Sequence, residues 1–129
     1  MAVGKDLPIL IVDDYRSMLK IVRGLLQQLG FTNVDEATDG QTAYSMIAGR
    51  TYGLVISDWN MQPMTGLDLL KRVRSEPKTA KLPFIMVTAE AKAENVVAAR
   101  QAGVNNYIIK PFTQAVLKQK MVAVLGEFA

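Results

Sequence analysis

Carboxylate side chains stand directly after two short apolar runs of the sequence. Asp13 and Asp14 follow the run Ile9–Val12, and Asp58 follows the predicted strand Leu54–Ser57. Runs this short and apolar are typical of strands that are buried on both faces of a parallel sheet. The carboxyl ends of parallel strands meet at one edge, where open α/β folds bind their ligands. We therefore expect these three carboxylates to lie close together.

Two other polar residues, Thr88 and Lys110, also directly follow apolar runs, so they are expected at the same edge. Carboxylates that lie close together repel each other unless a cation is present. Three carboxylates, one lysine and one Mg²⁺ sum to a neutral site. We expect Asp14 and Asp58 to ligate Mg²⁺ directly, with Asp13 acting mainly through water and the backbone carbonyl of Asn60 as another ligand.

A partly hydrated Mg²⁺ leaves a position for a phosphoryl oxygen. The Thr88 hydroxyl and the Lys110 ammonium are donors suited to negative charge that develops on phosphorus. Asp58 is then the predicted nucleophile of a phosphoryl transfer and forms an acyl phosphate. These groups supply position and charge, and the chemistry needs no histidine.

Composition excludes several other kinds of site. The 129 residues contain no Cys and no His, so disulfides, thiolate chemistry, Ser-His-Asp catalysis and ordinary zinc sites are absent. A metal must therefore be held by oxygen atoms. The net charge is +3, but Lys and Arg are scattered, so we expect no nucleic-acid partner. No apolar run is long enough to cross a membrane and the first residues do not resemble a signal peptide, which predicts a cytoplasmic protein.

Five short apolar runs alternate with five amphipathic stretches along the chain, which predicts one α/β domain over residues 1–129. The last helix is expected to begin after a cap at Thr113. Alternation favours a doubly wound parallel sheet with helices on both faces and right-handed crossovers. The expected strand order is 2-1-3-4-5, as in flavodoxin-like folds. The predicted strands are 9–13, 33–37, 54–57, 83–88 and 106–109, and the fourth helix is expected over 91–102.

Several motifs together resemble the receiver domains of two-component response regulators, and in particular the single-domain chemotaxis receivers of the CheY type. The resemblance covers essentially the whole chain. It rests on Val12-Asp13-Asp14, Asp58-Trp59-Asn60-Met61, Met64-Thr65-Gly66, Val87-Thr88-Ala89-Glu90-Ala91-Lys92 and the spaced Tyr107, Lys110-Pro111-Phe112.

The resemblance implies that a histidine kinase, CheA-like, phosphorylates Asp58 in the presence of Mg²⁺. Thr88 then moves toward the phosphoryl group and Tyr107 moves inward, which changes the face made by the fourth helix, fifth strand and fifth helix. That face is implied to bind a flagellar motor switch protein of the FliM type. Asn60 and Glu90 are implied to tune self-dephosphorylation, and the Lys110-Pro111 peptide is implied to be cis. The implied protein is a monomer that is not an enzyme beyond its own phosphorylation and slow dephosphorylation.

Other functions remain open at this point. Within the same family, the chain is alternatively a phosphate sink or a regulator of a target other than the motor, with or without a dedicated phosphatase. An aspartyl-nucleophile phosphatase is less well supported, because such hydrolases carry a second acid two residues after the nucleophile, where this chain has Asn60. A flavin module is disfavoured because acids, and not a hydroxyl-rich phosphate loop, follow the first strand.

Overall fold

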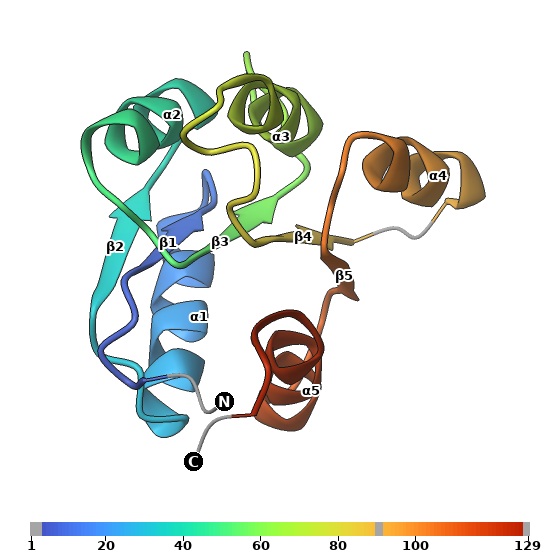
Figure 1. Ribbon diagram of the computed structural model, residues 1–129. Coiled ribbons are helices and arrows are strands. Elements are labelled where there is room, and N and C mark those ends of the chain that lie inside the picture. Colours follow the sequence, from blue (N-terminus) through green and yellow to red (C-terminus); the bar gives the residue numbers. More distant parts are fainter. Residues whose placement is uncertain (1–3, 90–91, 128–129) are drawn as a thin grey trace.

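A computed structural model describes residues 4–89 and 92–127, and within these ranges five parallel strands form one sheet (Figure 1). The strand order is β2-β1-β3-β4-β5, which confirms the predicted topology. The central strands β1, β3 and β4 are buried throughout, as expected for a sheet covered on both faces, whereas the edge strands β2 and β5 are only partly buried. The strands are β1 Ile9–Val12, β2 Val34–Ala37, β3 Leu54–Asp58, β4 Phe84–Thr88 and β5 Asn106–Ile109.

The strand ends differ from the predicted ones by a single residue. Asp13 lies just beyond β1, whereas Asp58 is the last residue of β3. The first residues of the predicted second and fourth strands, Asn33 and Pro83, lie outside β2 and β4. Proline has no backbone N–H and contributes no ladder hydrogen bond, so its place just before β4 is favourable.

Helices cover both faces of the sheet. In Figure 1, α1 and α5 lie together on one face, and α2, α3 and α4 lie on the other. The predicted fourth helix was longer at both ends, and residues 90–91 lie outside the described part of the chain. The helices are α1 Arg16–Gln28, α2 Gly40–Gly49, α3 Gly66–Ser75, α4 Ala93–Gln101 and α5 Gln114–Leu125.

Side-chain caps fix the starts of three helices. The Thr113 side chain accepts a hydrogen bond from Val116 N, which confirms the predicted cap of α5. Asp39 accepts from Thr42 N at 2.7 Å at the start of α2. Thr65 and Asp68 form a reciprocal capping box at the start of α3. The cap at Thr65 matters for the site, because it fixes where the loop after β3 ends.

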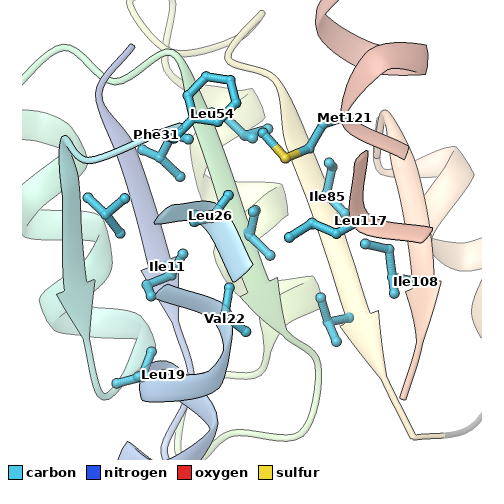
Figure 2. Packing of buried hydrophobic residues seen from close by; sticks show 14 residues of the cluster. Ile11, Leu19, Val22, Leu26, Phe31, Leu54, Ile85, Ile108, Leu117 and Met121 are labelled. Carbon is cyan, nitrogen blue, oxygen red and sulfur yellow. The ribbon is translucent and has the colours of Figure 1, made fainter. Parts of the chain in front are cut away.

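Two apolar clusters hold the layers together, one on each face. On the α1 and α5 face, side chains such as Leu26 and Leu117 lie over the strand residues Ile11, Ile85 and Ile108 (Figure 2). The other cluster joins α2 and α3 to the sheet. Methionines contribute to both clusters: Met86 and Met121 are buried, and Met18 and Met46 pack against the clusters. None of the helices in 4–89 and 92–127 has an apolar stretch sufficient to cross a bilayer.

Arg74 ties α3 to the loops that surround α4. Its guanidinium donates to Gly103 O at 3.0 Å, to Leu82 O at 2.6 Å and to Asn105 Oδ1 at 2.8 Å. Burial lowers the pKa of Arg74 from its ordinary value. The carbonyl of Gly103 follows the end of α4, so this side chain links the ends of two helices on the same face of the sheet.

Candidate functional site

Asp13, Asp14 and Asp58 each offer a carboxylate oxygen within 4.8 Å of the others, at the carboxyl end of the sheet. The parallel pairing of Val12 with Ser57 brings the two strand ends side by side. Asp13 and Asp58 are only 4% and 3% exposed, whereas Asp14 is exposed. The predicted cluster of acids is therefore present, with two buried members and one at the surface.

Lys110 joins the two buried carboxylates. Its ammonium nitrogen lies 3.3 Å from Asp13 Oδ2 and 3.0 Å from Asp58 Oδ1. Asp13 Oδ1 also accepts a hydrogen bond from the backbone N–H of Tyr15 at 3.0 Å. The ammonium is at ion-pair distance from Asp58 Oδ1 but not in a hydrogen-bonding direction, so in the described part of the chain this buried oxygen has no hydrogen-bond donor.

Burial raises the pKa of both inner carboxyl groups. Burial raises the pKa of Asp58 most, and the negative charge of Asp13 raises it further. Lys110 favours the charged carboxylate and so lowers this pKa in part. Burial also raises the pKa of Asp13, by more than the hydrogen bond from Tyr15 and the charge of Lys110 lower it. Burial alone would lower the pKa of the Lys110 ammonium, but Asp58 and Asp13 together raise it. The ammonium therefore stays charged and leaves the cluster with an excess of negative charge.

The donor set fits a hard divalent cation. Three carboxylates from two strand ends supply only oxygen, and Asp58 Oδ1 is a buried acceptor that lacks a donor. Asn60 lies in the exposed loop two residues after Asp58. Within the described residues, its backbone carbonyl accepts no hydrogen bond and so remains available as a ligand, which is compatible with its predicted role.

The loop after β3 is held close to Asp58 by one carbonyl. Trp59 O accepts hydrogen bonds from Met61 N at 3.0 Å and from Gly66 N at 2.9 Å. A Cβ at Gly66 would come within 2.3 Å of Asp58 O, so only glycine lets α3 begin this close to the strand end. This contact was not predicted. It depends on the path of the loop, for which the residue pattern carries no signal.

Two peptide bonds near the site are cis. Lys110-Pro111 is cis, as implied by the family resemblance, and Gln62-Pro63 is also cis, which was not predicted. The backbone N–H of Lys110 donates to Thr88 O at 2.8 Å, so the ends of β4 and β5 are joined beside the carboxylates.

Thr88 and Tyr107 form a second group next to the acids. Thr88 is buried one residue beyond Val87, which pairs with Asp58 across β3 and β4. The Tyr107 hydroxyl is hydrogen-bonded to Thr88, while burial raises the Tyr107 pKa. The Tyr107 ring meets the Trp59 ring edge-on, with centroids 6.3 Å apart. Thr88 and Tyr107, predicted as a switching pair, are thus in contact, and Trp59 is an unpredicted third member of the group.

Glu90, predicted to tune dephosphorylation together with Asn60, lies outside the described residues. The predicted partner face contains exposed apolar side chains on α4 and β5, since Val97 is 52% exposed and Ile109 is 48% exposed. Lys118 is exposed and Lys120 is half-buried on α5. The residues predicted to act at the strand ends therefore converge, while the residues of the partner face lie on the outside of the molecule.

Comparison with known proteins places the chain in a family. The model of the response regulator receiver domain matches residues 9–122. The chemotaxis protein CheY-3 of Vibrio cholerae is 51% identical over 118 residues, which make up 92% of this chain and 91% of that protein. The structure of CheY4 from the same species superposes with a TM-score of 0.87 at 31% identity, over 93% of this chain and 99% of the other.

A further solved structure has the same fold. The receiver domain of a sensor histidine kinase from Pseudomonas aeruginosa has a TM-score of 0.85 at 25% identity, over 95% of this chain and 99% of that one. It was solved with a magnesium ion coordinated in its active-site cleft. On these grounds, and with its five parallel strands and converging acids, the chain belongs to the response regulator receiver domain family and is a receiver of the CheY type.

Proposed function

We propose that this receiver accepts a phosphoryl group on Asp58 from the phosphohistidine of a CheA-like histidine kinase. The observation that carries the proposal is the contact of one ammonium, Lys110 Nζ, with the two buried carboxylates of Asp13 and Asp58. A lysine in this position balances part of the acidic charge and offers N–H donors to a phosphoryl oxygen. Its raised pKa keeps it protonated at neutral pH.

In the transfer, a carboxylate oxygen of Asp58 forms a bond to phosphorus as the bond from phosphorus to the imidazole nitrogen of the donor breaks. The imidazole leaves and takes up a proton from solvent, and Asp58 carries an acyl phosphate. Lys110 lies where negative charge develops on the transferred group. Thr88, one residue beyond the neighbour of Asp58 on β4, supplies a hydroxyl for a phosphoryl oxygen.

Asp13, Asp14, Asp58 and the carbonyl of Asn60 are the residues that would hold Mg²⁺. When bound, Mg²⁺ neutralises the carboxylates and the phosphoryl oxygens. The family relative with magnesium in its cleft supports this choice of metal. Asn60 stands where phosphatases of the aspartyl type carry a second acid, which argues against turnover of small phosphate esters. The protein is therefore a phosphoacceptor and not an enzyme in the ordinary sense.

The phosphorylated state is read out through Thr88 and Tyr107. Movement of Thr88 toward the new phosphoryl group breaks or re-forms its hydrogen bond with Tyr107, which lies on β5 beside α4. The face of α4, β5 and α5, with Val97 and Ile109 exposed, then binds a flagellar motor switch protein of the FliM type. The population of the binding-competent state shifts because the phosphoryl group interacts differently with the two states. We expect a cytoplasmic monomer.

Labelling tests the acceptor role. The protein is incubated with acetyl phosphate or with phosphorylated CheA, and protein-bound phosphate that resists acid and is released by base is measured. We expect labelling only with Mg²⁺, none in Asp58→Asn, and full labelling in Glu76→Gln, an exposed acid at the other end of the sheet. Labelling of Asp58→Asn as strong as that of the wild type would overturn the proposal.

A binding measurement tests the partner separately. Titration calorimetry with the N-terminal peptide of the motor switch protein is run with and without beryllofluoride, which mimics the phosphoryl group on an aspartate. We expect tighter binding with beryllofluoride, and a loss of that gain in Val97→Ser with Ile109→Ser. If labelling succeeds but the peptide binds equally weakly in both states, the chain is a phosphate sink or regulates another target.

A further inference from the structure

An open cleft lies at the end of the sheet opposite Asp58. One wall is the segment Ala48–Tyr52 after α2, and the other is Glu76–Pro83, between α3 and β4, so we call it the distal cleft. Its volume is about 890 Å³, at the upper end of the range for ligand sites. The length of β3, about 13 Å at ~3.3 Å per residue, separates it from the acidic cluster.

The floor of the distal cleft is apolar and aromatic. Ile47 and Tyr52 are buried, and Tyr44 and Leu82 are half-buried, with faces that line the cleft. Tyr44 is fixed from the other side by the Arg72 guanidinium, 3.9 Å from the ring centroid. Such a floor accepts an apolar or aromatic side chain without rearrangement of the fold.

The rim is positively charged on both walls. The charged residues that line the cleft are Arg50 on one wall and Lys78, Lys81 and Glu76 on the other, which gives an excess of positive charge. Arg50 forms an ion pair with Asp35. Across residues 4–89 and 92–127, neither Lys78 nor Lys81 has an ion pair or a side-chain hydrogen bond, and both are exposed.

The two lysines are not needed to complete the end of α3. Thr79 Oγ1 donates to Val73 O at 2.7 Å, and Ser75 Oγ donates to Arg72 O at 2.7 Å. Arg74 holds Leu82 O within the same loop. Other side chains therefore donate hydrogen bonds to the carbonyls at this helix end. The ammonium groups of Lys78 and Lys81 are exposed and available to a binding partner.

We propose that the distal cleft binds an acidic segment of a protein partner, with glutamates or aspartates against Lys78 and Lys81 and one aromatic or aliphatic side chain on the floor. Charge complementarity selects an acidic partner, and two cations three residues apart along one wall favour an extended segment over a single small anion. The apolar floor adds affinity that exposed ion pairs alone do not provide. The site uses neither Asp58 nor the face of α4, β5 and α5, so both can be occupied at once.

The probe is a fluorescein-labelled peptide of eight residues, glutamates with one tyrosine and one leucine at the centre. Its binding is measured by fluorescence anisotropy, beside a peptide in which glutamine replaces glutamate. We expect binding that weakens as NaCl is raised, because exposed charges are screened. In Lys78→Glu with Lys81→Glu the dissociation constant should rise at least tenfold. The matched double variant, Lys20→Glu with Lys71→Glu, carries the same charge change elsewhere and should stay within twofold of the wild type.

Amide chemical shifts from NMR locate the peptide on the ¹⁵N-labelled protein. We expect changes at residues 48–53 and 76–82, in the wild type and equally in Asp58→Asn, since phosphorylation plays no part. Equal binding of the glutamine peptide, equal loss in the two double variants, or shifts confined to α4, β5 and α5 would overturn the proposal. Unchanged acetyl phosphate labelling and thermal unfolding of Lys78→Glu with Lys81→Glu show that this variant is folded.

Discussion

The ammonium of Lys110, just after β5, lies 3.0 Å from Oδ1 of Asp58 at the end of β3. It also lies 3.3 Å from Asp13 Oδ2, so one cation serves two buried carboxylates. The arrangement has two consequences. The site holds an excess of negative charge that favours a divalent cation, and Asp58, the proposed phosphoacceptor, lies beside an ammonium group.

Replacement of Lys110 tests how much its charge contributes to the free energy of unfolding. Lys110→Met leaves Asp13 and Asp58 buried without their cation, and we expect the metal-free protein to lose about 2–3 kcal/mol of unfolding free energy. Adding Asp58→Asn should restore part of that loss, because one of the repelling charges is removed. Urea unfolding of the two single variants and the double variant measures the coupling energy. Additive losses would contradict an interaction between the two side chains.

Magnesium should stabilise the folded protein. A cation that binds only the native state at a hundred times its dissociation constant adds about 2.7 kcal/mol to the unfolding free energy. Asp13→Asn removes one of the three carboxylates and should reduce this gain strongly, whereas Glu76→Gln should keep it. Thermal unfolding with EDTA and with added MgCl₂ gives the measurement. An equal shift in Asp13→Asn and the wild type would place the cation elsewhere.

The group of Thr88, Tyr107 and Trp59 is open to a fluorescence test, since the chain contains one tryptophan. Tyr107→Phe removes the hydroxyl bonded to Thr88 but keeps the ring, so we expect about 1 kcal/mol of destabilisation and an unchanged Trp59 emission maximum. Tyr107→Ala removes the ring against Trp59 and should shift the emission to longer wavelength. Tyr44→Phe removes the hydroxyl of a tyrosine in α2 and is the control for the loss of a tyrosine hydroxyl elsewhere in the protein.

Gly66 and Gly24 form a matched pair for substitution by alanine. A Cβ at Gly66 would lie 2.3 Å from Asp58 O, so Gly66→Ala should displace the end of β3 and cost about 2 kcal/mol or more. A Cβ at Gly24, in the middle of α1, meets nothing within 4 Å, so Gly24→Ala should stabilise by about 0.5–1 kcal/mol. Chemical denaturation measures both, and acetyl phosphate labelling should fall only in Gly66→Ala. Unimpaired labelling there would show that the strand end tolerates the shift.

Alkaline pH should weaken the fold through Tyr52. Burial, followed by its hydrogen bond to Asp35, raises the pKa of Tyr52 to about 12. Unfolded chains lose this proton near pH 10, so between about pH 10 and 12 the native state binds more protons and stability falls as pH rises, by about 1–2 kcal/mol. The pKa of Tyr107 is also raised by burial, so absorbance at 295 nm should show late-titrating tyrosine, and the component with a pKa of about 12 should disappear in Tyr52→Phe. Unchanged late titration in that variant would assign the high pKa to another tyrosine.

The residue pattern predicted the sheet because its central strands β1, β3 and β4 are nearly continuous apolar runs that end at or before polar residues. The run Ile9–Val12 is fully buried in β1, and Asp13 comes directly after it. Strand order and the meeting of Asp13 with Asp58 followed from alternation and the known topology of doubly wound sheets. Lys110 was predicted at the same edge of the sheet, and in the structure its ammonium contacts both carboxylates.

Contacts that depend on the path of a loop could not be predicted from the sequence. The approach of Gly66 to the Asp58 carbonyl and the edge contact of Trp59 with Tyr107 both arise from how the chain turns after β3. Helix ends were also less certain than strand ends, because α4 has only one fully buried residue, Ala99, and a weak apolar stripe does not define where a helix begins. The distal cleft could not be seen at all, because its walls come from two loops that share no motif.

The contact between Lys110 and Asp13 closes 97 residues of chain. A site assembled across that separation exists only when the first and last strands are both in place in the same sheet. An unfolded chain contains Asp13, Asp58 and Lys110, but it does not hold the ammonium between the two carboxylates. If the proposed function holds, we expect unfolded copies to take up no phosphoryl group, so that labelling counts only the folded population.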